Sequence, residues 1–512
     1  MSEEKKEKQV RMPHWYEAIL PILVLLVIMI LNYIFDWGQD AHIPCLIACV
    51  VAFGVGKACG LSYTETLAGA LSSLSRCLEA ILILFCIGVL IGSWLAAGTI
   101  PAIVYYGLNL ITPQVFLPVA CIISAIVAVS MGSSWTTNGT VGIAFMTIGA
   151  SLGFNPALTA GMCISGAYTG DKFSPLSDTT NLAAAASETG LFDHVRAMVS
   201  TTLPSFIIAL VCYTLAGLGA SSNYDNSVVV GLQNDILAQY NHMSPLLLLP
   251  IILVIGACIM RVPSIAGILF SAVIALAMAA GLQGASFSDL ITFSHYGYGD
   301  YINEVFFEAE EAHELIIKLL DRGGMDSMLW TINLVIVAVA FGGLLEKIGA
   351  VESLMGGLVK KVTKPWHAVL LTMATSFVCD WTMCDQYLAI IIPGQMYQDK
   401  FDELGLGRNM LSRTLEDLGT LWSPMCPWNS CGAYQSGVLG MSPFVYMPFS
   451  FMNLINPIFA LVTAALGRNI LYADGSYTGL FSTQLKQGAV AGAPEEGHAK
   501  ALAALKQIRG EA

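Results

Sequence analysis

Charged residues are scarce in this sequence. Of its 512 residues, only 12% are Asp, Glu, Lys or Arg, which is about half of the ~25% that is typical of soluble proteins. Hydrophobic residues make up 55% of the chain, and the mean hydropathy is +0.68. These values exclude an ordinary soluble domain and indicate an integral membrane protein, whose first partner is the lipid bilayer. The sequence also has no basic patch, so nucleic acid is not an expected partner.

Motifs of enzymes and of disulfide-rich secreted proteins are missing as well. Most of the 13 cysteines lie in apolar segments, where Cys acts as a small hydrophobic residue. The pairs Cys379/Cys384 and Cys426/Cys431 match no usual zinc spacing. Residues 54–58 (GVGKA) lack the first glycine and the Ser or Thr of a nucleotide-binding P-loop. We therefore expect neither an enzyme nor a nucleotide-driven pump, and no cofactor.

Long apolar runs are frequent. A helix that crosses the bilayer needs about 20 mostly apolar residues, and ten runs qualify as spans: 18–35, 42–59, 79–97, 158–188, 198–218, 244–260, 264–282, 328–347, 409–440 and 444–467. Two further apolar regions, 115–152 and 366–396, are broken halfway by GSSWTTNGT and CDWTMCDQ. Because each half is too short to span alone, we expect two re-entrant hairpins, which are tolerated only when buried in protein or lining a cavity.

Lys and Arg predict the orientation, since cytoplasmic loops are enriched in them. They occur in residues 1–17 and in alternate loops, whereas 36–41, 98–114 and 218–243 contain none. The N-terminal segment has no small-residue cleavage site behind it and is expected to be a cytoplasmic tail. The pattern places both termini in the cytoplasm. The loop 283–327 carries nine acids and is expected outside, with an amphipathic helix that Gly323 and Gly324 stop.

The two halves of the chain resemble each other. Four landmarks recur in the same order, with offsets between 246 and 252 residues: Gly98 with Gly349, Pro113 with Pro365, Trp135-Thr136 with Trp381-Thr382, and Ser174-Pro175 with Ser423-Pro424. The loop 99–114 has no Lys or Arg, whereas its counterpart after Gly349 has three, so the second copy is inverted. Five spans per half require this inversion, because an odd number of spans turns the second copy over.

These observations predict an all-α polytopic membrane protein with two inverted repeats, each of five spans and one re-entrant hairpin, and with broken helices at the midplane. The expected parts are a cytoplasmic N-tail (1–17), repeat 1 (18–218), an outer loop (219–243), repeat 2 (244–470, with the outer loop 283–327) and a cytoplasmic C-tail (471–512). Inverted repeats with broken helices are typical of secondary transporters.

Two polar stretches interrupt apolar runs, one in each repeat. Residues 165–186 (SGAYTGDKFSPLSDTTNLAAAA) and 413–434 (RTLEDLGTLWSPMCPWNSCGAY) carry charges that a lipid-facing helix could not hold. Pro175 removes a backbone donor and breaks the helix, and the freed carbonyls are potential ligands for a small cation. We expect the two broken helices to face each other and to form an ion site.

Several of these segments resemble a known family. GDKFSPLSDTTNLA at 170–183, DQYLAIIIPGQM at 385–396, LSRTLEDLGTLWSPMCPWNSCGA at 411–433 and GSSWTTNGTVGIA at 132–144 resemble motifs of the NhaC family of Na+/H+ antiporters. The resemblance implies the inverted-repeat plan of the ion transporter superfamily, a place in the bacterial cytoplasmic membrane and, as often in that superfamily, a homodimer. It also implies exchange of Na+, or Li+, for H+ by alternating access, with no cofactor besides the transported ions.

Such exchange needs a group that binds either ion but not both, which a carboxylate does if its pKa lies near the cytoplasmic pH. Asp178 is the first candidate, because neutral oxygens surround it and hard cations favour oxygen ligands. Asp385, at the tip of the second hairpin, is the second predicted Na+ ligand. For Asp178 the competing interpretation is a helix cap. Asp171 is equally compatible with a structural ion pair to the adjacent Lys172, its expected charge partner, and Asp417 with a purely structural role.

Neutral side chains in the same segments could complete an ion site, or could satisfy backbone groups that the breaks set free. They are Thr137, Asn138, Ser174, Thr179, Thr180, Asn181, Ser423 and Asn429. The alternative function is a Na+- or H+-coupled exchanger of a small organic acid, of the malate or lactate type, or of an amino acid. That alternative needs a fixed cation in the site, for which Lys172 and Arg413 are the only candidates near the breaks.

Overall fold

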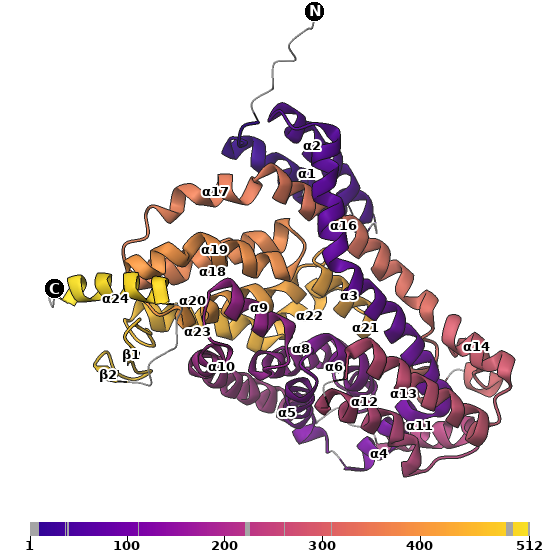
Figure 1. Ribbon diagram of the computed structural model, residues 1–512. Coiled ribbons are helices and arrows are strands. Elements are labelled where there is room, and N and C mark those ends of the chain that lie inside the picture. Colours follow the sequence, from indigo (N-terminus) through magenta and orange to yellow (C-terminus); the bar gives the residue numbers. More distant parts are fainter. Residues whose placement is uncertain are drawn as a thin grey trace, which may run out of the picture.

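A computed structural model of the chain describes residues 10–35, 37, 40–110, 112–220, 226–260, 262–308, 310–487 and 495–509. Parts of the predicted N-tail, outer loop and C-tail (1–9, 221–225, 488–494 and 510–512) lie outside these ranges. Helices dominate the described chain, and its one sheet is the antiparallel pair β1 (Ser476–Thr478) and β2 (Leu485–Gln487) (Figure 1). The predicted class of a helical polytopic membrane protein is confirmed.

The described part of the first half of the chain contains eleven successive elements. They are α1 (Trp15–Ile34), α2 (His42–Ala58), α3 (Tyr63–Ala97), α4 (Thr99–Leu110), α5 (Pro113–Met131), α6 (Ser134–Thr137), the π-helix η1 (Asn138–Gly142), α7 (Ile143–Ser151), α8 (Pro156–Phe173), α9 (Asp178–Ala186) and α10 (Leu191–Ala220).

The middle of the chain contains α11 (Asn226–Gln239), η3 (Pro245–Leu248), α12 (Leu249–Ile259), α13 (Ser264–Met278), η4 (Ala279–Gln283), α14 (Phe287–His295), η5 (Gly299–Tyr301), η6 (Glu304–Phe307) and α15 (Glu311–Leu320). The second half follows with η7 (Met325–Met328), α16 (Leu329–Ile348), α17 (Ala350–Val359), α18 (Pro365–Thr382), α19 (Gln386–Glu403), α20 (Arg408–Leu415), the π-helix η8 (Glu416–Thr420), η9 (Ser423–Met425), α21 (Ser430–Leu439), α22 (Pro443–Tyr446), η10 (Met447–Phe449), α23 (Phe451–Ala465) and α24 (Glu495–Arg509).

By length and composition, six described helices can cross a membrane: Trp15–Asn32, Tyr63–Ala97, Pro113–Met131, Leu191–Gly219, Ile265–Gln283 and Met325–Ile348. The pair Pro443–Phe449 and Phe451–Ala465, bent by 61°, makes a seventh if it is counted as one span. These are fewer unbroken spans than the ten that the sequence predicts. The predicted spans 158–188 and 409–440 are interrupted helices, and 42–59 and 244–260 form helices that are too short.

Both predicted hairpins turn where their polar breaks lie. Gly132 and Ser133 separate α5 from α6, and residues 383–385 separate α18 from α19. The prediction that each limb is too short to span is wrong for α5. This helix begins with Pro113 at its first turn and runs for 19 residues, which at ~1.5 Å per residue approaches the ~30 Å of the hydrocarbon core.

Glycines let the first hairpin pack closely against the first broken helix. Helix α5 lies along α8, and a Cβ atom at Gly170 would come within 2.1 Å of the Ala125 carbonyl oxygen, while one at Gly166 would come within 2.5 Å of the Cys121 carbonyl oxygen. Only glycine allows this approach. The end of α5, and with it the turn at Gly132 and Ser133, is therefore held beside the break that follows α8.

The two predicted outer loops are largely helical. Helix α11 lies within 219–243, and α14 precedes the expected amphipathic helix of 283–327. That helix is split into η6 and α15, and it ends at Leu320, before the two glycines that were expected to stop it. Figure 1 shows α11, α12, α13 and α14 together at one corner of the molecule, with α24 at the opposite side.

An ion pair connects α15 to α11 in this outer region. Nδ1 of His313 lies 2.8 Å from Oδ2 of Asp235, and its Nε2 lies 3.7 Å from Oε2 of Glu310. The ring of Phe306 packs against the imidazole, with 5.4 Å between the ring centroids. The pKa of His313 is raised, mainly by the hydrogen bond to Asp235. Partial desolvation opposes this rise, while the negative charges of Asp235, Glu310 and Glu308 add to it.

This pair predicts a pH-dependent stability. The folded-state pKa of His313 lies above the unfolded value of ~6.5, so its stabilisation is complete below about pH 6.5 and is lost as the pH rises through the folded pKa. We expect His313→Gln to lower the thermal unfolding midpoint of the purified protein at about pH 6 and to leave it almost unchanged at about pH 9. The exposed His242, changed to Gln, is the control, and an equal effect of His313→Gln at both pH values would contradict the prediction.

Candidate ion-binding site

The first broken helix opens between Phe173, where α8 ends, and Asp178, where α9 begins. Ser177 caps α9 by accepting a hydrogen bond from the Thr180 backbone N–H at 3.4 Å. Ser174 donates to the Val129 carbonyl oxygen (2.8 Å), which ties the break to the first hairpin. Two further predicted ligands also have backbone partners here. Asn181 donates to the carbonyl oxygens of Pro175 (3.0 Å) and Ser177 (2.8 Å), and Thr180 donates to that of Asp171 (3.3 Å).

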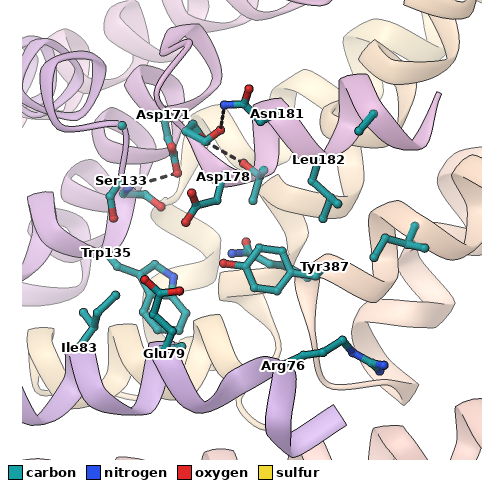
Figure 2. A pocket seen from close by; sticks show the side chains of 18 residues that line it. Arg76, Glu79, Ile83, Ser133, Trp135, Asp171, Asp178, Asn181, Leu182 and Tyr387 are labelled. Atoms are coloured by element: carbon teal, nitrogen blue, oxygen red, sulfur yellow. Dashed lines mark hydrogen bonds between the residues drawn. The ribbon is translucent and has the colours of Figure 1, made fainter. Parts of the chain in front are cut away.

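A cavity of about 690 Å³ lies against this break. Its wall comes from α3, from the turn between α5 and α6 with the start of α6, from the end of α8, from the break with the first turns of α9, and from the start of α19. The polar and aromatic side chains among the residues that line it are Arg76, Glu79, Ser133, Ser134, Trp135, Asp171, Ser177, Asp178, Thr179, Asn181, Gln386 and Tyr387. Figure 2 shows Asp171 and Asp178 on one side of this cavity and Glu79 on the other.

The three carboxylates of the cavity have few partners. The structure gives neither Asp178 nor Glu79 a hydrogen bond or ion pair within the described chain, and both are exposed to the cavity. Asp171 is only 9% exposed and accepts one hydrogen bond, from the Ser134 backbone N–H at 3.1 Å, while its Oδ1 atom is buried without a partner. Ser177 caps α9, so Asp178 itself is not the cap and its carboxylate is free to bind a cation.

Asp385, the second predicted Na+ ligand, lies outside the lining of this cavity. It is 2% exposed and caps α19, where its Oδ1 accepts from the Tyr387 backbone N–H at 2.9 Å. The next two residues, Gln386 and Tyr387, do line the cavity. The second hairpin therefore reaches the site through the residues that follow Asp385.

Other predicted oxygen ligands also lie away from the cavity and have partners. Thr137 donates to the Ser133 carbonyl oxygen (2.8 Å), and Asn138 donates to Oε1 of Gln435 (2.8 Å). In the second broken helix, Ser423 donates to the Thr420 carbonyl oxygen (2.8 Å). Asn429 caps α21 and donates to the Asp380 carbonyl oxygen (3.1 Å). Of the predicted set, the cavity brings together Asp171, Asp178, Thr179 and Asn181.

Lys172 does not pair with its neighbour Asp171, which corrects the predicted ion pair. Its ammonium group donates to Oε2 of Glu416 (3.1 Å), to the Glu416 carbonyl oxygen and to Oγ1 of Thr420 (3.1 Å). Consecutive residues of a helix point about 100° apart, so Asp171 faces the cavity while Lys172 faces η8. The resulting salt bridge is almost fully buried, with 2% and 0% of the two side chains exposed.

Arg413 and Asp417 form a second buried pair beside it, with 3.6 Å between Nε and Oδ2. Oδ1 of Asp417 also accepts hydrogen bonds from Thr201 and Asn456, both at 2.8 Å. Asp417 therefore lies among donors and a cation, away from the cavity. Both cations that were considered for an anion site are thus paired with carboxylates.

Sequence reasoning missed Glu79. The predicted span 79–97 begins at this residue, whereas α3 begins much earlier, at Tyr63, so Glu79 lies inside the helix and reaches the cavity. One feature of the sequence points to Glu79: Arg76 lies three residues before it, so a helix that contains both would carry two charges on one face. Arg76 itself pairs with Glu346 of α16 at 2.5 Å.

The region around the breaks is similar to a known family. Residues 166–468 match the profile of the Na+/H+ antiporter family, and this match covers more than half of the chain. The chain belongs to the Na+/H+ antiporter family. The matched region of this antiporter-family chain contains the break between α8 and α9, the second hairpin and the second broken helix, while the first hairpin and α3 precede it.

Relatives in this family have different names. The chain is 32% identical over 449 residues to the Na+/H+ antiporter NhaC of Alkalihalophilus pseudofirmus, with 88% of this chain and 95% of the relative covered. It is 34% identical over 484 residues to the malate-2H+/Na+-lactate antiporter of Bacillus subtilis (94% and 98% covered). It is 36% identical over 468 residues to the arginine/ornithine antiporter ArcD of Halobacterium salinarum (90% and 94% covered). The predicted resemblance to the NhaC type is confirmed, and the relatives' names alone leave several substrates open.

Proposed function

We propose that this chain is a secondary active antiporter that exchanges Na+ or Li+ for H+ by alternating access, with Asp178 as the carboxylate that carries either ion. The observation that carries the proposal is the unpaired Asp178 carboxylate, which lies at the break of a membrane helix and lines a 690 Å³ cavity. Ser177 and Thr179 add hydroxyl oxygens to the same wall, and hard cations prefer such oxygen ligands. The name of the NhaC relative supports the same two exchanged ions, Na+ and H+.

The charge distribution argues against the alternative of an organic-acid exchanger. A substrate carboxylate needs a free cation in its site, because a buried unpaired charge is costly. Among the described residues, Arg76 is the one Lys or Arg in the cavity lining, and it is engaged by Glu346. Lys172 and Arg413 are engaged by Glu416 and Asp417. A cation is therefore the better substrate for this cavity.

Two inverted repeats are part of the proposal. Both α3 and α16 end at a glycine with positive φ, Gly98 (85°) and Gly349 (72°). Each is followed by a short helix, by a hairpin whose first helix begins with a proline, and by a broken helix. This shared order supports a repeat of the same plan in the segments 18–218 and 244–470, for each of which we propose five spans and one hairpin.

The inverted arrangement and the orientation can be tested together. Thr112 and Lys364 precede α5 and α18 at equivalent positions, and both are exposed. If both termini are cytoplasmic and the repeats are inverted, an impermeant thiol reagent added to whole cells should label Thr112→Cys. It should label Lys364→Cys only after lysis, with the native cysteines of the parent protein as background. Labelling of both positions from the same side would rule out the inversion.

Transport in proteoliposomes tests the function itself. If one carboxylate serves both ions, protons and Na+ exclude each other, so the apparent KM for Na+ should rise as the pH falls, by up to about tenfold per pH unit below the carboxyl pKa. The measurement is Na+-driven proton flux at a series of pH values, with Li+, K+, malate, lactate and amino acids tested in place of Na+. A KM for Na+ that stays flat between about pH 6 and pH 9 would contradict a shared site.

A further inference from the structure

The cavity beside the break is much larger than a sodium ion. At ~30 Å³ per water molecule, its 690 Å³ corresponds to roughly twenty waters, and it falls within the range of ~300–1,000 Å³ that is usual for small-molecule sites. The volume therefore admits an organic molecule in contact with the same carboxylates that would bind Na+.

The carboxylates are arranged around this volume. Glu79 extends from α3 toward the cavity, while Asp171 and Asp178 lie on the opposite wall (Figure 2). Within the described chain, neither Glu79 nor Asp178 has a hydrogen-bond or ion-pair partner. The unpartnered Oδ1 atom of Asp171, on a side chain that is only 9% exposed, is an independent sign of a missing ligand, since a buried acceptor is costly when it lacks a donor.

Two aromatic rings, of Trp135 and Tyr387, line the same cavity. Trp135 stacks on Tyr434, with 4.3 Å between the centroids, and Tyr434 donates a hydrogen bond to the Trp135 carbonyl oxygen at 2.7 Å. These contacts fix the indole in place. Faces of aromatic rings attract organic cations, above all guanidinium and alkylammonium groups.

No unpaired cation lines the cavity among the described residues, because Arg76 is held by Glu346. A ligand with a carboxylate would bring a negative charge next to Glu79, Asp171 and Asp178 without compensation. The lining thus selects for cationic groups and against anionic ones, including the carboxylate of an amino acid.

We propose that this cavity binds a small organic cation that carries an ammonium or guanidinium group and no carboxylate, held between Glu79 and Asp178 and in competition with Na+. The inference deepens the proposed function. Only its claim of competition with Na+ rests on that function. Glu79 is the specificity-determining residue, because it supplies the second carboxylate that a single metal ion at Asp178 does not require.

Agmatine and arginine provide a matched test, since they share a guanidinium group and only arginine carries a carboxylate. We expect isothermal titration of the purified full-length protein, in Na+-free potassium buffer, to show agmatine binding at least about tenfold tighter than arginine binding. Glu79→Gln should weaken agmatine binding about tenfold, and Glu79→Asp, which keeps the charge, should recover part of that loss. Glu304→Gln removes the same charge from the exposed outer region and should change nothing. Added Na+ should weaken agmatine binding to the parent protein.

Arginine binding as tight as agmatine binding, or an unchanged affinity in a folded Glu79→Gln protein, would overturn the inference. The outcome is separable from that of the proposed function. Intact Na+/H+ exchange without agmatine binding removes only the organic-cation site. Agmatine binding that depends on Glu79, in a protein without Na+/H+ exchange, keeps the site and removes the proposed exchange.

Discussion

Asp178→Asn is expected to abolish Na+-driven proton flux in proteoliposomes while the protein still inserts and folds. The change keeps the size of the side chain and removes its charge, so the site can no longer exchange a proton for Na+. Folding should be preserved because Asp178 is exposed to the cavity and has no hydrogen-bond or ion-pair partner in the described chain, and because Ser177 supplies the helix cap. We expect a loss of at least about 100-fold in flux, as for a lost charge-assisted contact of ~3 kcal/mol.

Two variants serve as comparisons. Asp300→Asn, in the exposed outer region, removes the same charge far from the cavity and should leave flux unchanged. Asp385→Asn tests the second predicted ligand, because Asn is as good an N-cap as Asp and so keeps α19 capped. Lost flux in Asp385→Asn assigns its charge to the ion path, and retained flux assigns Asp385 to capping. Wild-type flux in Asp178→Asn would remove Asp178 from the ion site.

Lys172→Met is expected to be strongly destabilising. The change leaves the Glu416 carboxylate buried without its cation, and breaking a buried ion pair in this way costs about 3–5 kcal/mol. The purified variant should therefore show a much lower thermal unfolding midpoint and a low yield of monodisperse protein. Lys318→Met, which breaks an exposed pair with Glu314, is the matched control and should cost about 0.3–0.5 kcal/mol.

A double variant separates the pair from other roles of Lys172. Lys172→Met combined with Glu416→Gln removes both charges, and most of the lost stability should return, because replacing a whole buried pair is often nearly neutral. If the double variant is stable and still exchanges Na+ for H+, Lys172 is structural. If it is stable but its flux depends differently on membrane voltage, Lys172 takes part in the ion coupling. A single variant as stable as the parent would contradict the buried pair.

Local chemistry explains which features could be predicted from the sequence. The break at 174–177 follows from Pro175 and from a run of polar residues, and both helices end there as expected. The same composition placed Asp178 at a polar site in the membrane. The outer helices α11 and α14 were missed because their segments were judged by charge and by position between spans.

Pairings between distant segments could not be predicted in this way. Lys172 has an acid beside it in the sequence, yet its partner is Glu416, because helix geometry turns adjacent side chains in different directions. Glu79 was missed for a related reason. The segment before it is amphipathic, so hydropathy alone makes the predicted span begin at residue 79. In the structure the helix packs against α16 and begins earlier, at Tyr63.

The Lys172–Glu416 contact also has a consequence for biosynthesis. The two residues are 244 positions apart, and a ribosome that adds ~5–20 residues per second needs about 12 to 50 s to cover that distance. During this interval the nascent chain holds a lysine in its first broken helix with no carboxylate from the second half to meet it. The first broken helix therefore cannot reach its final packing until the second half is made, and until then Lys172 needs water or the insertion machinery around it.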